Sequence, residues 1–176
     1  MATVQLRDIV TAADRVAALG IEQGPGQDQF VASVEGSFAD AIAHPEACAR
    51  YWAVYDADQP VGFAMISDNI AKETLDADAT LVGPYFLWRL LIDRRHQRKG
   101  YGTATLDAVV AYVRGRPGGD TLLTSAGQGE GSPQPFYERY GFVPTGEVME
   151  GEVVLRLDLG ASADLARPDT FQSQQH

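Results

Sequence analysis

Cysteine and histidine are scarce in this chain of 176 residues. Cys48 is the single cysteine, which excludes an internal disulfide framework and any cysteine-rich zinc or iron–sulfur site. His44, His96 and His176 are scattered and form no H-E-x-x-H pattern, so nothing in the sequence indicates a metal enzyme. The lone thiol fits a reduced, cytoplasmic setting.

Long apolar runs are absent as well. No stretch reaches the roughly 18 apolar residues that a membrane span requires, and residues 1–8 lack the basic and apolar regions of a signal peptide. We therefore expect no membrane partner. The length fits one domain, predicted to span residues 1–160, and the polar residues 161–176 are expected to form a disordered tail.

Basic residues are outnumbered, with 14 Lys and Arg against 24 Asp and Glu and a net charge of −10. Proteins that bind duplex nucleic acid neutralise phosphates, so we expect no nucleic-acid partner. Residues 21–82 hold eleven acids and two bases, whereas five bases fall within residues 89–99. Two interpretations stay open: solvated loops, or one site with a basic half for an anion and an acidic half for a cation.

Hydrophobic periodicity and turn signals predict alternating strands and helices. The predicted strands are residues 4–9, 51–55, 61–67, 85–92, 121–124, 142–143 and 152–157. The predicted helices are residues 12–19, 28–43 and 103–113, together with a short helix that Ser132 opens as N-cap. Residues 68–80 are polar and are expected to form a connecting loop.

The most informative segment joins the apolar strand at residues 85–92 to the amphipathic helix at residues 103–113. The turn between them is rich in arginine and lysine and contains Gly100 and Gly102. A strand that enters a helix through such a turn aims backbone N–H groups at one point, which suits a pyrophosphate. The turn is not a G-x-x-x-x-G-K-[ST] loop, and Thr105 stands where a dinucleotide fingerprint needs glycine.

Two motifs carry a resemblance to a known family. The segment Gln97-Arg98-Lys99-Gly100-Tyr101-Gly102 resembles the Q/R-x-x-G-x-G/A signature of the GNAT N-acetyltransferase superfamily. The segment Pro135-Phe136-Tyr137-Glu138-Arg139-Tyr140-Gly141-Phe142 resembles its second hallmark, F-Y-x-x-x-G-F. The similarity spans residues 4–158, and its closest likeness is to bacterial spermine/spermidine or diamine acetyltransferases.

The resemblance implies an α/β fold with a mixed central β-sheet, splayed at its central strand and flanked by helices. It implies acetyl-CoA as co-substrate, with the pantetheine arm along the strand edge and the pyrophosphate on the glycine turn. The residues that it assigns to acetyl-CoA are Leu90, Leu91, Ile92, Gln97, Arg98, Lys99, Gly100, Tyr101, Gly102, Thr103 and Phe136. By motif position Tyr137 is the acid that protonates the leaving thiolate, and Tyr140 is the alternative.

The proton acceptor is not evident from the sequence. Some polyamine-acetylating relatives place a glutamate on the central strand, where this chain has Trp88, which cannot accept a proton. Glu35 and Asp68 are the candidates to hold or deprotonate the amine, and Trp88 is included as a substrate contact. Asp93 is expected to form a local ion pair with the basic turn.

The expected reaction is direct attack of a small cationic amine, such as a polyamine, on acetyl-CoA in a ternary complex. One alternative is an acyl-CoA-binding sensor without turnover, and another is acetylation of proteins or peptides. A covalent route through Cys48 would need a histidine base that the sequence does not identify. Homodimers are common among the relatives, so a homodimer stays open.

Overall fold

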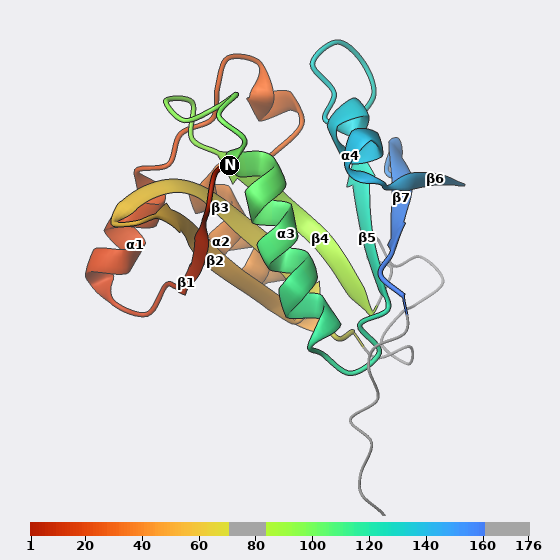
Figure 1. The fold of residues 1–176 in the computed structure, drawn as a ribbon, viewed down its shortest axis with the longest axis horizontal. Helices are drawn as coiled ribbons and strands as arrows, with labels where there is room; N and C mark the ends of the chain where they lie inside the picture. Colours follow the sequence, from red (N-terminus) through yellow and green to blue (C-terminus); the bar gives the residue numbers. More distant parts are fainter. Residues whose placement is uncertain (71–83, 161–176) are drawn as a thin grey trace, which may run out of the picture.

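The computed structural model describes residues 1–70 and 84–160, which form one seven-stranded sheet with helices on both faces (Figure 1). The strands are β1 (Gln5–Asp8), β2 (Ala49–Asp56), β3 (Gln59–Asp68), β4 (Tyr85–Ile92), β5 (Thr121–Ala126), β6 (Val143–Met149) and β7 (Glu152–Asp158). The helices are α1 (Ala12–Leu19), α2 (Val34–Ala43), α3 (Tyr101–Arg114) and α4 (Gln134–Tyr140), with 3-10 turns at Gln27–Gln29 and Pro45–Ala47. The predicted α/β class and mixed sheet are confirmed.

Two hydrophobic layers hold this arrangement together. On one face of the sheet, α3 buries Leu106, Val109 and Val113 against apolar side chains of the central strands. On the other face, Ala18 of α1 and Phe38 of α2 pack in a second cluster with residues of β2, β3 and β4. Because both faces of β4 are covered, its sequence is almost continuously apolar, as the sequence predicted.

The sheet opens between β4 and β5. Its strand order is β1-β2-β3-β4-β5-β7-β6, and β4 and β5 are the only parallel neighbours in the described chain. They pair only at Phe86 with Leu123 and at Leu87 with Thr124, and beyond these positions they diverge (Figure 1). The edge of β4 from Trp88 to Ile92 therefore faces an opening instead of a neighbouring strand.

A β-bulge on β4 lies at this opening. Leu87 pairs with Ile66 and Arg89 pairs with the adjacent Met65, which leaves Trp88 as an extra residue. A bulge increases the local twist and re-aims side chains, and it is common beside active sites. Here the bulge brings Trp88, Arg89 and Leu90 to the same cavity. In a regular strand, successive side chains point to opposite faces of the sheet, so three successive residues would not line one cavity.

Several predicted boundaries shift. The predicted helix at residues 28–43 was wrong in its first part, because Ser33 caps α2 by accepting a hydrogen bond from Gly36 N at 3.1 Å. Pro133, not Ser132, occupies the N-cap position of α4, and Ser132 Oγ accepts from Gln134 N. β6 extends to Met149, although its exposed residues carry no apolar alternation.

Other expectations need less change or lie outside the described residues. α1 has the predicted bounds, and Thr11 and Asp14 form a reciprocal capping box at its start. The expected tail at residues 161–176 and most of the expected loop at residues 68–80 lie outside the part that the structure describes. In the described part, no helix has the length and apolar character needed to cross a membrane.

Candidate active site

The turn between β4 and α3 is built around the buried carboxylate of Asp93. Asp93 is fully buried and accepts hydrogen bonds from Arg95 Nε at 2.8 Å, from Arg95 N at 2.9 Å and from Glu22 N at 2.9 Å. The Arg95 guanidinium and these amides hold the pKa of the Asp93 carboxyl well below its usual range, against the opposing effect of burial. The predicted ion pair of Asp93 with the basic turn is present and fixes the turn.

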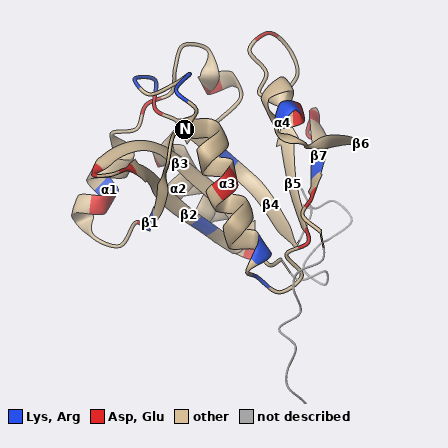
Figure 2. Cartoon of the chain, in the orientation of Figure 1, with Lys and Arg blue, Asp and Glu red and all other residues tan. Residues whose placement is uncertain are grey.

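The rest of the turn presents backbone groups at the start of α3. Arg98 and Gly100 adopt left-handed φ angles of +61° and +85°, which bend the chain into the helix. No side chain of the described residues caps the N-terminus of this 14-residue helix, so its first amides and its dipole are open to an anion. Figure 2 shows the basic residues of the turn gathered just before α3.

Gln97 has a structural position in this turn. Its Nε2 donates to the Ile92 carbonyl at 3.1 Å and to Gln27 Oε1 at 2.7 Å. The side chain thus ties the turn to the end of β4 and to the loop before α2. Gly102 permits a further close approach, because a Cβ there would lie 3.1 Å from Phe136 Cζ of α4.

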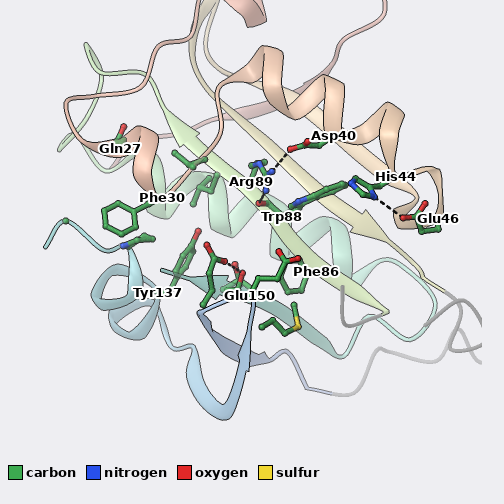
Figure 3. Close-up of a pocket in the computed structure, with 18 residues that line it drawn as sticks. Gln27, Phe30, Asp40, His44, Glu46, Phe86, Trp88, Arg89, Tyr137 and Glu150 are labelled. Carbon is green, nitrogen blue, oxygen red and sulfur yellow. Dashed lines mark hydrogen bonds and ion pairs between the residues drawn. The ribbon is translucent and has the colours of Figure 1, made fainter. Parts of the chain in front are cut away.

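A cavity of about 450 Å³ occupies the opening of the sheet (Figure 3). β4 contributes Phe86, Trp88, Arg89 and Leu90, and the remaining lining comes from α2 and its flanking loops, β5, α4 and the β6–β7 turn. None of the residues of the basic turn lines this cavity. The opening therefore has two parts. One is the edge of β4 that leads from the basic turn at residues 93–100, which we call the anion turn. The other is the cavity itself, which we call the chamber and which is lined by Tyr137 and several carboxylates.

Tyr137 is the central polar group of the chamber. It lies in α4, is 6% exposed and packs its ring against Phe136 and Phe142. Burial raises the pKa of its hydroxyl to about 12; a side-chain hydrogen bond with Thr124 opposes this rise, and the charge of Glu152 adds to it. Tyr137 is therefore protonated at neutral pH and can act as a proton donor.

Thr124 links Tyr137 to the point where the strands separate. Its Oγ donates to the Leu87 carbonyl at 3.0 Å, at the last pair of residues that joins β4 and β5. A threonine hydroxyl has one proton, which can be turned from that carbonyl to a tyrosinate once Tyr137 has given up its own. Thr124 can thus stabilise the charge that proton donation would leave on Tyr137.

The chamber is acidic. Within residues 1–70 and 84–160, its lining holds four carboxylates, Asp40, Glu46, Glu150 and Glu152, against the single guanidinium of Arg89. Arg89 Nη2 bonds to Asp40 Oδ2 at 2.7 Å, and His44 Nδ1 lies 3.1 Å from Glu46 Oε1 (Figure 3). Arg89 pairs with only one of the four carboxylates, so the lining retains an excess of acidic groups, which favours a cationic ligand.

The structure brings some of the predicted site residues together and separates others. Leu90, Trp88 and Tyr137 line the chamber, and Phe136 lies against the start of α3. Glu35 is exposed on α2 and does not line the cavity. Asp68 lies at another part of the sheet, where it accepts a hydrogen bond from Tyr112 and pairs with Arg116 at 3.1 Å.

Tyr140, the alternative to Tyr137 as proton donor, and Cys48, the alternative covalent nucleophile, also lie outside the chamber. The Tyr140 hydroxyl donates to Asp107 Oδ1 at 2.7 Å, and burial together with this bond raises its pKa. Cys48 is exposed, and its thiol is directed toward the Glu46 carbonyl at 3.7 Å. The sequence did not indicate Asp40, Arg89, Glu150 and Glu152 as lining residues. These residues come from segments far apart in the sequence, and only the fold brings them together.

An open sheet edge, an anion turn and a buried tyrosine define a site of the coenzyme A-dependent acyltransferase class. The model of the acetyltransferase (GNAT) domain matches residues 47–144, and the chain belongs to this family. A comparison with curated proteins gave no match. The chain is thus an N-acetyltransferase that uses acetyl-CoA.

Solved structures show the same fold at low sequence identity. A GNAT-family protein from Desulfovibrio desulfuricans is 23% identical with a TM-score of 0.59, covering 90% of this chain and 100% of its own. The ribosomal-protein-S18-alanine N-acetyltransferase of Escherichia coli is 18% identical with a TM-score of 0.57, covering 95% of this chain and 99% of its own. AtaTR with bound acetyl-CoA is 19% identical with a TM-score of 0.62, covering 90% and 95%. A related complex, AtaT–AtaR, is bound to DNA.

The described geometry fits acetyl-CoA. The β4 edge from Trp88 to Ile92 has backbone groups without a partner strand on the side of β5, as a pantetheine arm requires. The uncapped amides at the start of α3 suit the pyrophosphate, and exposed Arg98 and Lys99 lie beside them. When bound there, acetyl-CoA supplies the activated acetyl group.

Proposed function

We propose that this protein transfers the acetyl group of acetyl-CoA to a primary amine of a small cationic acceptor of the polyamine type. Transfer occurs by direct attack in a ternary complex, without an acetylated enzyme. The observation that carries the proposal is the excess of carboxylates in the chamber beside Tyr137. A cavity of about 450 Å³ falls within the range of small-molecule sites.

Charge attraction accounts for the choice of acceptor. A primary amine resembles the lysine side chain, with a pKa of about 10.4, and arrives as an ammonium ion. The carboxylates of Glu150 and Glu152 are positioned to attract it, while the ion pair of Asp40 with Arg89 limits the charge at the α2 side. An acceptor with a second amine gains a further attraction in the same chamber.

Tyr137 would act at the collapse of the tetrahedral intermediate. Its hydroxyl, with a pKa of about 12, is a weaker acid than a thiol of about 8.5, so a simple transfer to a finished thiolate would be uphill by about 5 kcal/mol. Transfer becomes favourable when the amide nitrogen, which is still protonated, passes its proton to the tyrosine at the same time. Tyr137 therefore relays a proton from nitrogen to sulfur.

Mass spectrometry of the reaction products tests this function. The purified protein is incubated with acetyl-CoA and separately with spermidine, spermine, 1,4-diaminobutane, an aminoglycoside, a basic peptide and a neutral peptide. The expected result is one added acetyl group on a small polyamine. Acetylation of peptides alone would refute the acceptor class, and acetyl-CoA binding without any product would favour a sensor.

A further inference from the structure

Glu152 is the best-placed carboxylate in the chamber for chemistry. It is the first residue of β7, is partly buried and lines the same cavity as Tyr137. Its Oε2 accepts a short hydrogen bond from Ser125 Oγ of β5. This bond ties the carboxylate to Ser125, the residue that follows Thr124 at the last pair between β4 and β5.

The other carboxylates of the chamber are engaged or more exposed. Asp40 pairs with Arg89 at 2.7 Å, and Glu46 bonds to His44 at 3.1 Å. Glu150 is exposed in the β6–β7 turn. Glu152 has no basic partner among the ion pairs of the described residues, so its charge is available to an ammonium ion.

The groups around Glu152 support a role in proton transfer. The charge of Glu152 contributes to the raised pKa of Tyr137, so the two groups act within one electrostatic environment. Tyr137 of α4, Glu150 of the β6–β7 turn and Arg89 of β4 line the same cavity as Glu152. A proton acceptor and a proton donor therefore flank the same space.

We propose that Glu152 is the catalytic residue that accepts the proton of the acceptor ammonium ion, and that Ser125 is its positioning residue. This inference rests on the proposed function and identifies the group that the central strand lacks. Trp88, at the position where some relatives have a glutamate, cannot accept a proton, whereas Glu152 reaches the chamber from β7, on the other side of the opening.

The proposed sequence of steps balances in atoms and charge. Glu152 takes one proton from R–NH₃⁺, and the neutral nitrogen forms a C–N bond to the acetyl carbonyl carbon, whose oxygen becomes an oxyanion. As the carbonyl re-forms, the C–S bond breaks and the sulfur takes the Tyr137 proton. At the same time Tyr137 takes the remaining extra proton from the nitrogen, and Glu152 afterwards releases its proton to water.

The decisive experiment compares two acceptors in two variants. Glu152→Gln keeps the shape of the side chain and removes its basicity, and Glu147→Gln is the matched control on the exposed β6, outside the cavity lining. One acceptor is the amine of the panel with the highest turnover. The other is 2-(aminooxy)ethylamine, which has one ammonium group for recognition and an alkoxyamine that is unprotonated at neutral pH.

With the ordinary amine, Glu152→Gln should lower kcat by roughly 100-fold or more, the usual contribution of a general base. With 2-(aminooxy)ethylamine the loss should shrink to less than about tenfold, because no proton has to be removed before attack. Glu147→Gln should match the wild-type protein with both acceptors. Acetyl-CoA affinity, measured by calorimetry, should be unchanged in both variants.

Each other outcome overturns the inference in a recognisable way. An equal loss of kcat with both acceptors would show that Glu152 does not act by removing the ammonium proton, and a rise in KM at constant kcat would assign Glu152 to binding alone. Unchanged turnover would remove it from the site. If the wild-type protein acetylates no amine, the proposed function itself has failed, and the role of Glu152 fails with it.

Ser125 provides a second, independent measurement. Ser125→Ala removes the hydrogen bond that orients the carboxylate but leaves its charge, so kcat should fall less than in Glu152→Gln. Ser125→Thr restores a hydroxyl and should recover most of the turnover. Loss in both variants to the same extent would show that the hydroxyl does not position Glu152.

Discussion

Replacing Tyr137 by phenylalanine separates catalysis from stability, because the change removes one buried hydroxyl and little else. The ring keeps its contacts with Phe136 and Phe142. Thr124 still donates to the Leu87 carbonyl at 3.0 Å, so no buried donor loses its partner. The free energy of unfolding should therefore change by only about 0.5–1.5 kcal/mol. For a chain of this length, Tm should fall by about 1–6 °C.

The effect on turnover should be much larger. A general acid contributes roughly 10²- to 10⁴-fold, which equals about 2.7–5.4 kcal/mol in the barrier of acetyl transfer. Tyr137 lines the acceptor chamber and not the anion turn, so the affinity for acetyl-CoA should stay within about threefold of wild type. The Tyr137→Phe variant should thus have low kcat, unchanged acetyl-CoA binding and nearly unchanged Tm.

The assay measures initial rates of product formation by mass spectrometry, with acetyl-CoA affinity from calorimetry and Tm from circular dichroism. Tyr140→Phe is the control, because that hydroxyl bonds to Asp107 outside the chamber and its loss should leave kcat within about twofold. Turnover of Tyr137→Phe close to that of wild type would refute the assignment of Tyr137 as the proton donor.

Two further predictions concern the anion turn. Asp93→Asn should weaken the turn, lower stability at neutral pH by about 1–3 kcal/mol and reduce acetyl-CoA affinity, because Arg95 and Glu22 N lose a charged acceptor. Since the folded pKa of Asp93 is depressed, its contribution is present above the unfolded value of about 3.9 and is lost as the pH falls below it. Unfolding by urea should therefore show a smaller loss of stability below about pH 4 in the variant; an identical pH dependence would contradict this. Gly100→Val should reduce acetyl-CoA affinity at least tenfold, because φ is +85° there and a β-branched residue resists that conformation; calorimetry showing normal affinity would disprove the assigned turn.

Gly100 is required for its backbone conformation and not for space within the chain. A Cβ at Gly100 would meet only Ala2 Cβ, at 3.7 Å, so crowding within the chain is not the obstacle. The backbone conformation is what excludes other residues. Close approach is instead the requirement at Gly102, where Phe136 lies near the helix.

The charge pattern along the sequence proved informative only in part. Asp40 and Glu46, from the acidic residues 21–82, do line the chamber, but Glu35 and Asp68 from the same segment do not. Asp68 is instead used by Tyr112 and Arg116. Local sequence cannot separate these cases, because the helix face and the strand register decide which carboxylate meets the cavity.

The sequence by itself determined the elements whose signals are local. The Thr11 cap, the apolar run of β4, the glycine turn and the Phe-Tyr helix are each encoded within a few residues of one another. Hydrogen-bonding side chains, periodicity and glycine conformations act over such short distances, so the turn before α3 could be located from the sequence. Tyr137 was assigned through the resemblance to the GNAT family, because its local sequence does not distinguish a catalytic tyrosine from a packed one.

Only the tertiary structure decided how the chamber is assembled. The bulge at Trp88 depends on the register between β3 and β4, and the contact of Glu152 with Ser125 depends on the pairing of β5 with β7. The ion pair of Arg89 with Asp40 joins residues 49 positions apart. Such contacts follow from packing of the whole sheet, in which a shift of one residue turns a side chain to the opposite face.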